Sequence, residues 1–66
     1  MLKFEVWIHE KTGYEYCVIS EGKVKFVDKW EPSVNYQRLS FKVTDDTETV
    51  YTRTKDDFLD NFKPKI

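Results

Sequence analysis

The residues whose spacing most suggests chemistry are Asp56, Asp57 and Asp60, which form an Asp-Asp-x-x-Asp pattern. Carboxylates at this spacing can hold magnesium together with a diphosphate group. A site of that kind also needs a second acidic cluster and a deep apolar cavity, and a chain of 66 residues has too small a core to form the cavity. We therefore expect a structural role for these carboxylates and no metal site.

The same stretch has the features of a capped helix. Thr54 and Asp57 have the spacing of a capping box, and acidic residues in a first helical turn interact favourably with the helix dipole. Pro64 is suited to end the helix because proline cannot continue the backbone hydrogen bonding. The expected apolar face consists of Phe58, Leu59 and Phe62. We predict a short amphipathic helix that lies over one open end of a β domain.

His9 and Cys17 are the other candidates for chemistry, because a first β-hairpin would bring them close together. With Glu10 or Glu15 they would imitate a nucleophile pair or a metal site. An exposed histidine at a strand end and a buried small thiol are the more common arrangement. The chain also has no glycine-rich phosphate loop and no nucleophile elbow. We expect no catalytic residues, no cofactor and no enzymatic activity.

Chain length and composition limit the domain organisation. We expect residues 1–66 to form a single small domain, and an aromatic content of 17% favours a folded chain although 35% of the residues are charged. A single cysteine cannot form an internal disulfide, and it suits a reducing compartment. The sequence has neither a signal-peptide pattern nor an apolar run of membrane-spanning length. We therefore predict a cytoplasmic protein that does not contact a membrane.

Apolar and polar residues alternate along most of the chain, which is typical of β-strands. Strands are expected at 2–9, 14–20, 23–30, 36–44 and 48–53. Gly13 and Gly22 mark tight turns, and Pro32 is expected to end pairing in a longer loop. We predict a mainly all-β fold, a small five-stranded antiparallel SH3-like barrel with a short C-terminal α-helix. An OB-like barrel and a three- or four-stranded sheet packed under the helix are the alternatives.

The alternation also predicts which side chains face the core. In the first strand the expected inward set is Leu2, Phe4, Val6 and Ile8. Trp7 lies on the opposite face, where it is either exposed or covered by the helix. In the second strand the face with Tyr14, Tyr16 and Val18 is favoured as the inward one, and the face with Cys17 and Ile19 is the alternative. In the later strands the expected inward residues are Val24, Phe26, Trp30, Leu39, Phe41 and Val43.

Basic side chains fall on the outer faces of the third and fourth expected strands, although the net charge of the chain is only -1. One register sets Lys29 opposite Arg38, so that like charges face one another and favour a bound anion. A register shifted by two residues sets Glu31 opposite Arg38 and leaves a solvated charged face. The candidate nucleic-acid-binding residues are Lys23, Lys25, Lys29, Arg38 and Lys42, with Tyr36 as a stacking ring.

The aromatic residues are more numerous than a core of this size needs. Tryptophan and tyrosine at the rim of a β-barrel are favoured anchors for protein partners. The candidate protein-binding residues are Trp7, Tyr14, Trp30 and Tyr36. A second small core beneath the helix is the alternative use of these rings.

Three motifs follow one another along the chain: Gly-x-x-Tyr-x-Val at 13–18, Gly-x-Val-x-Phe at 22–26 and Phe-Leu-x-x-Phe at 58–62. Together they resemble the small uncharacterised SH3-like barrel proteins encoded by phages and prophages of bacteria. The resemblance implies an accessory or inhibitor protein of a phage or mobile element, which binds a host or phage protein and catalyses no reaction.

The predicted function is therefore that of a non-enzymatic protein–protein interaction module. A small barrel that binds nucleic acid weakly through the basic residues is the alternative. An exposed strand edge would also allow two copies to pair as a homodimer.

Overall fold

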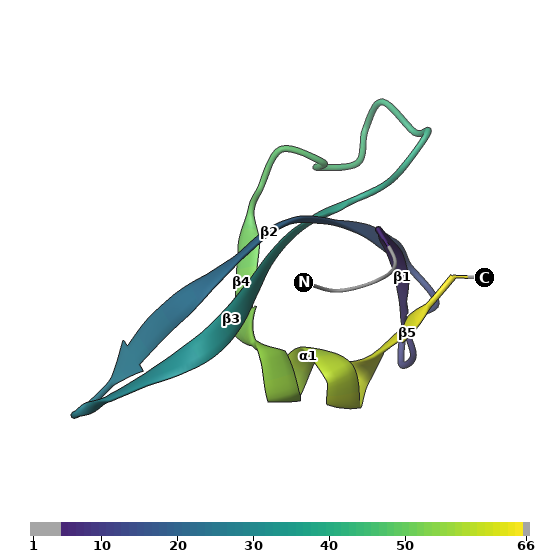
Figure 1. Cartoon of the computed structure of the whole chain (residues 1–66). Helices are drawn as coiled ribbons and strands as arrows, with labels where there is room; N and C mark the ends of the chain where they lie inside the picture. Colours follow the sequence, from purple (N-terminus) through teal and green to yellow (C-terminus); the bar gives the residue numbers. More distant parts are fainter. Residues whose placement is uncertain (1–4, 66) are drawn as a thin grey trace.

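The computed structural model describes residues 5–65, which form one antiparallel β-sheet and one short helix (Figure 1). The elements in chain order are β1 (Val6–His9), β2 (Glu15–Phe26), β3 (Lys29–Arg38), β4 (Tyr51–Thr54), α1 (Lys55–Asn61) and β5 (Phe62–Pro64). Their order in the sheet is β4-β3-β2-β1-β5, so the last strand pairs with the first. The prediction of a mainly β chain with five antiparallel strands and a short C-terminal helix is confirmed.

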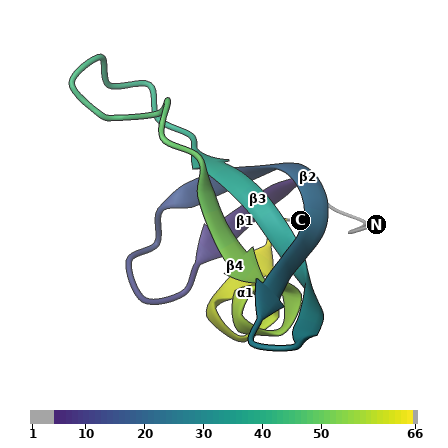
Figure 2. The same cartoon turned by 90° about the vertical axis from the view of Figure 1, so that its left-hand side faces the viewer.

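The sheet curls around α1 but is not closed (Figures 1 and 2). Its two edge strands are β4 and β5, and α1 joins them directly along the chain. In β2 the pairing with β3 shifts between Val18 and Ser20, and a β-bulge of this kind bends a strand and increases its twist. The curvature gives the sheet a concave face, which α1 covers, and a convex face on the outside.

The core lies between the concave face of the sheet and α1. Its buried apolar side chains are Trp7, Val34, Tyr36, Phe58 and Phe62, with Tyr16 and Val18 packed against them. Trp7 meets Phe58 edge to face with ring centroids 5.1 Å apart, and Phe58 stacks on Phe62 at 4.3 Å. Aromatic pairs in such arrangements contribute about 0.5–1.5 kcal/mol beyond the burial of their area. Because Phe58 is fully buried, α1 is an integral part of the core.

The face of β1 that reaches the core is the one that carries Trp7. Val6 and Ile8, which were predicted to point inward, are half-buried on the opposite face, and Leu2 and Phe4 lie outside the described residues. Trp7 has the largest apolar surface in this strand, so burying it beneath α1 removes more area from water than burying either aliphatic side chain. Of the two positions predicted for Trp7, the structure shows the one covered by the helix.

The predicted turn at Gly22 is wrong, because β2 continues through this residue to Phe26. Gly22 pairs with Ser33 of β3, and the chain reverses at Val27 and Asp28 instead. Pro32 also lies within a strand, beyond the end of β4, where an outward-facing position without an amide hydrogen loses no ladder bond. Glycine and proline often mark turns, but a strand with a neighbour on one side only tolerates both.

The predicted strand 36–44 is wrong beyond Arg38, where a loop of residues 39–50 begins. In this loop Ser40 Oγ accepts a hydrogen bond from the Lys42 amide at 3.1 Å, and Asp46 Oδ1 accepts one from the Glu48 amide at 3.0 Å. Side chains that bind the nearby backbone in this way compete with strand pairing. The expected inward residues Leu39, Phe41 and Val43 are consequently exposed. The following strand, expected at 48–53, is β4 at Tyr51–Thr54.

The helix begins as predicted, with Thr54 as its N-cap. Thr54 Oγ1 accepts a hydrogen bond from the Asp57 amide at 3.2 Å, and this bond satisfies one of the free donors at the helix start. The Asp57 carboxylate in turn accepts a hydrogen bond from Arg53 Nη1 at 2.8 Å. The second acid of the Asp-Asp-x-x-Asp pattern therefore has a structural partner on the preceding strand.

The apolar face of α1 is narrower than predicted. Phe58 and Phe62 are buried, whereas Leu59 is exposed. The helix ends at Asn61, and Pro64 belongs to β5, where it pairs with Trp7. The helix packs against β3, β4 and β5, so it covers the gap between the two sheet edges.

Candidate protein-binding surface

The β2–β3 hairpin extends beyond the rest of the molecule. Pairing between β3 and β4 starts at Ser33, so residues 23–32 are paired only with each other. In Figure 1 this segment projects at the lower left, away from β1, and its residues Phe26, Glu31 and Pro32 line a hollow together with Thr54, Lys55 and Asp56 at the start of α1. We call residues 23–32 the hairpin tip.

Large apolar side chains are exposed at the hairpin tip. Phe26 is 54%, Val27 91% and Trp30 62% exposed to solvent. Val27 adopts a φ of 52°, in the left-handed region that β-branched residues rarely occupy. The tip therefore presents three apolar side chains to solvent, one of them on a strained backbone, and none of them contributes to the buried core.

The two rings of the hairpin tip point to opposite faces of the ribbon. Trp30 is paired with Lys25, and Phe26 with Lys29, so each ring shares its face with a lysine. The Lys25 ammonium lies 5.9 Å from the centre of the Trp30 ring, at the outer limit of a cation–π contact. Because each face of the hairpin tip carries a ring and a lysine, a partner can bury both rings only if the tip inserts into a groove.

Only part of the predicted protein-binding set lies on the surface. Trp7 and Tyr36 are buried in the core, which takes them out of reach of a partner. The Tyr36 hydroxyl accepts a hydrogen bond from Arg53 Nε at 2.8 Å, and this bond raises the pKa of Arg53 above its ordinary value. Tyr14 is exposed, but the guanidinium of Arg38 lies 3.8 Å from its ring centre, near the opposite end of β3 from Trp30. Trp30 and Tyr14 therefore belong to separate surfaces.

The predicted basic face is dispersed, and neither of the two expected registers occurs. Arg38 is paired with Tyr16 of β2 and forms an ion pair with Asp45 at 3.4 Å, while Lys42 lies in the 39–50 loop. Arg38 lies eight positions after Trp30 in β3, which corresponds to about 26 Å along the strand. The lysines that stay together are those of the hairpin tip, Lys23, Lys25 and Lys29. With Asp28 and Glu31 they give this segment a net charge of +1.

Two residues of the hairpin tip, Phe26 and Val27, were missed as binding candidates. Phe26 was predicted to belong to a strand spanning 23–30 and to point into the core of the domain. The available signal was the adjacent pair Phe26-Val27, which interrupts the alternation of apolar and polar residues.

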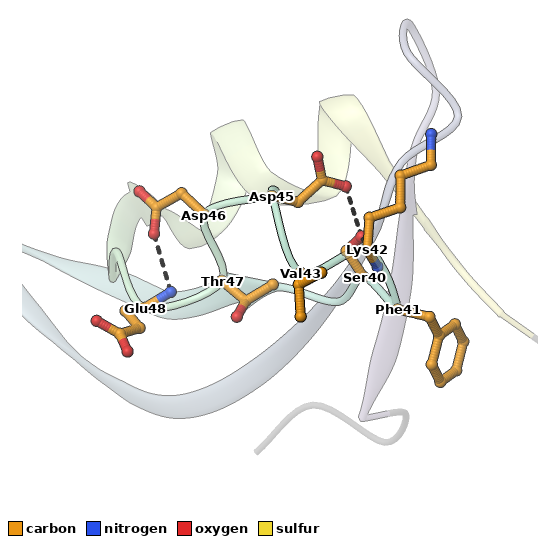
Figure 3. A pocket seen from close by; sticks show the side chains of 8 residues that line it. All are labelled: Ser40, Phe41, Lys42, Val43, Asp45, Asp46, Thr47 and Glu48. Atoms are coloured by element: carbon orange, nitrogen blue, oxygen red, sulfur yellow. Dashed lines mark hydrogen bonds between the residues drawn. The ribbon is translucent and has the colours of Figure 1, made fainter.

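A second exposed apolar region is the 39–50 loop. Phe41 and Val43 are fully exposed, and Leu39 and Val50 are largely so. Figure 3 shows the Phe41 side chain pointing away from the loop, and the carboxylates of Asp45 and Asp46 directed to other loop residues. Hydrogen bonds from the Thr49 hydroxyl and from the Glu48 and Thr49 amides lower the pKa of Asp46, so it stays ionised. The loop lines a shallow hollow of about 470 Å³ that is largely open to solvent.

The structure does not bring His9 and Cys17 together as a reactive pair. Cys17 is paired with Val6, whereas His9 is paired with Phe62 and lies with its ring 4.9 Å from the Phe62 ring. His9 Nδ1 is 3.0 Å from Thr12 Oγ1. The expected acidic partners bind lysines of the C-terminal segment: Glu10 lies 3.7 Å from Lys63, and Glu15 lies 2.7 Å from Lys65.

No protein-family model matches this chain, and no curated protein or solved structure is significantly similar to it. Within residues 5–65 the helix is α1, which has seven residues and is too short to cross a bilayer. Any function assigned to the chain is therefore inferred from its own surface.

Proposed function

We propose that this protein is a non-enzymatic interaction module that binds a protein partner through its hairpin tip. The observation that carries the proposal is the exposure of Phe26, Val27 and Trp30 on a ribbon that projects beyond the core. Large side chains left in water cost free energy in the isolated molecule, and that cost is recovered when a partner covers them. Tryptophan is also among the residues that most often dominate binding energy at protein interfaces.

The finer description of the fold is part of the same proposal. We infer an SH3-like arrangement from the pairing of β5 with β1 and from the position of α1 between the two edge strands. An accessory or inhibitor protein of a phage or mobile element, acting in the cytoplasm on a host or phage protein, is the role that the three sequence motifs imply. The projecting hairpin supports a binding role of this kind because it supplies a compact contact surface without any reactive group.

A comparative pull-down from bacterial lysate tests the proposal. Tagged wild-type protein is compared with a Phe26→Ser, Trp30→Ser double variant and with a Leu59→Ser control, whose side chain is exposed on α1. We expect mass spectrometry to identify at least one protein captured by the wild type and the control but lost with the double variant. Identical captured proteins for all three baits would contradict binding through the hairpin tip.

Nucleic-acid binding is the second candidate, favoured by the three lysines that flank the rings of the hairpin tip. Titration of single-stranded oligonucleotides at low salt, followed by tryptophan fluorescence, separates the two functions. Affinity that falls steeply with salt and is lost in a Lys25→Glu, Lys29→Glu variant would support nucleic acid as the ligand. Unchanged fluorescence at low salt would remove it.

A further inference from the structure

The two exposed apolar regions of the molecule carry opposite charge. The hairpin tip has a net charge of +1, whereas residues 39–50 combine Asp45, Asp46 and Glu48 with Lys42 for a net charge of -2, of which the ion pair between Asp45 and Arg38 compensates one unit. Both regions also expose aromatic side chains, Phe26 and Trp30 on the tip and Phe41 on the loop. Complementary charge combined with apolar surface on both sides is what a specific protein contact requires.

We propose that the hairpin tip of one copy binds the 39–50 loop of a second copy, head to tail. The proposal rests on the proposed function, because it takes the tip as the binding element and identifies a second copy of this chain as its partner. The acidic loop residues would then lie opposite the lysines of the tip, and the rings would share one apolar contact.

Two hollows beside the 39–50 loop are large enough to receive a side chain of the tip. The first, of about 470 Å³, is formed by the loop itself. The second, of about 520 Å³, has an apolar wall formed by Val6, Leu39 and Phe41 and a polar rim that includes Glu15 and Lys65. Both volumes fall within the range of about 300–1,000 Å³ that is typical of ligand pockets. An aromatic ring of the tip, inserted as a wedge, fits this kind of surface.

The two regions cannot contact each other within one copy. β3 connects them, and the nine residue steps from Trp30 to Leu39 span about 30 Å of extended chain. In Figures 1 and 2 the hairpin and the loop project in different directions. A contact between two different surfaces is heterologous, so repeated association builds a ring or an open chain rather than a closed symmetric dimer.

The contact is expected to be weak and reversible. The exposed apolar part of the tip consists of three side chains. The area that these side chains can bury is smaller than the roughly 1,600 Å² of total surface buried in a standard protein interface. Association should therefore depend on protein concentration and, because charges contribute, on salt.

Sedimentation velocity over about a hundredfold range of concentration tests the proposal, using wild type, Trp30→Ser and Phe41→Ser. We expect wild type to sediment as a series of growing oligomers. Each single variant should associate at least about tenfold more weakly than wild type. An equimolar mixture of the two variants is the decisive sample. The intact tip of Phe41→Ser fits the intact loop of Trp30→Ser, so the mixture should stop at a dimer containing one copy of each.

A charge exchange provides a second test that leaves the rings in place. Lys25→Glu and Glu48→Lys should each weaken self-association. Mixing the two should restore it, because the unchanged tip of Glu48→Lys, at +1, then meets the unchanged loop of Lys25→Glu, at -2, while the altered tip, at -1, meets a loop whose net charge is 0. Glu48 suits this exchange because its backbone atoms form its hydrogen bonds to Gln37 and Asp46. Leu59→Ser serves as the matched control and should associate like wild type.

The outcomes distinguish this proposal from the proposed function. Wild type that remains a monomer at the highest concentration, or a dimer that survives Phe41→Ser, overturns the head-to-tail contact and leaves capture of another protein by the tip unaffected. Loss of self-association in Phe41→Ser, together with unchanged capture of a lysate protein by the tip, would support the head-to-tail contact. In that variant the tip is intact and only the loop is altered. Oligomers that form only with added oligonucleotide also overturn the proposal.

Discussion

The two aromatic residues of β3 occupy the same face of one strand but have opposite environments. Tyr36 is buried, with its ring 5.4 Å from that of Phe58, whereas Trp30, six residues earlier, is 62% exposed. Both are paired with β2, Tyr36 with Val18 and Trp30 with Lys25, on either side of the bulge between Val18 and Ser20. The difference is that α1 and β4 reach Tyr36 and do not reach Trp30.

This contrast shows that strand pattern alone does not decide burial in a small sheet. Alternation assigns Trp30 and Tyr36 to one face, but the core extends only as far as the element that covers it. A seven-residue helix covers about one half of a ten-residue strand, so the other half is left as a projecting ribbon. The residues that stabilise the core and the residues of the proposed binding surface therefore lie at opposite ends of the same strand.

The largest expected difference between the two ends comes from removing one ring at each. Phe58→Ala removes the ring that contacts Trp7, Tyr36 and Phe62, and it should lower the free energy of unfolding by about 3–5 kcal/mol. Trp30→Ala removes an exposed ring and should change it by less than about 0.5 kcal/mol. Urea denaturation followed by circular dichroism measures both. Phe58→Leu, a milder change, keeps the comparison possible if the alanine variant does not fold.

A similar destabilisation in Phe58→Ala and Trp30→Ala would contradict the division of β3 into a covered and a free half. An unchanged free energy of unfolding in both variants would contradict the placement of Phe58 in a core beneath α1.

The attachment of α1 to the sheet gives the next largest effect. Thr54→Ala removes the hydroxyl that accepts the hydrogen bond from the Asp57 amide, and it should cost about 1 kcal/mol of unfolding free energy. Thr54→Ser keeps an N-cap oxygen and is the matched control. If urea midpoints show the alanine variant to be as stable as the serine variant, the cap does not hold the helix in place.

The overall class of the fold and the helix start could be predicted because their signals are local. Alternation identifies strands, and the Thr54 to Asp57 spacing identifies a cap. The ends of β2 and β3 could not be predicted, because Gly22 and Pro32 are turn signals whose meaning depends on how many strands lie beside them. The exposure of Phe26 and Trp30 depended on the reach of α1, which no local pattern contains.

The candidate surface was predicted less well than the fold for the same reason. Trp7 and Trp30 were both selected as protein-binding candidates, and only the tertiary structure separates the buried from the exposed one. The predicted basic face does not form because the expected fourth strand is the end of β3 followed by a loop, so Arg38 and Lys42 lie far from the lysines of the tip. A surface that depends on strand register is lost when one turn is misplaced.

Val27 offers a way to separate binding from stability at the hairpin tip. Its positive φ costs a β-branched residue about 1–2 kcal/mol, whereas glycine adopts this conformation freely but loses more backbone entropy on folding. Val27→Gly should therefore stabilise the fold slightly, by about 0.5 kcal/mol, while removing an exposed apolar side chain that the proposed contact uses. A urea midpoint that rises together with weaker capture of the partner would show that the strain is retained for binding. A variant that binds as well as wild type would remove Val27 from the contact.

The smallest expected effect concerns Tyr16, whose half-buried ring packs on Tyr36 and Phe62. Burial raises the pKa of the Tyr16 hydroxyl above its ordinary value of 10.0, and the positive charge of Arg38 opposes this only in part. Because the folded state holds the proton more tightly than the unfolded chain, stability from this group is fully present below pH 10 and is lost as the pH rises through the higher, folded-state pKa. Below pH 10 the urea midpoints of wild type and Tyr16→Phe should change in parallel. At higher pH the midpoint of wild type should fall more steeply than that of the variant. Titration of the lysines affects both proteins alike and does not alter this difference. Curves that stay parallel throughout would mean that the hydroxyl is solvated, and the covered half of the sheet would then end before Tyr16.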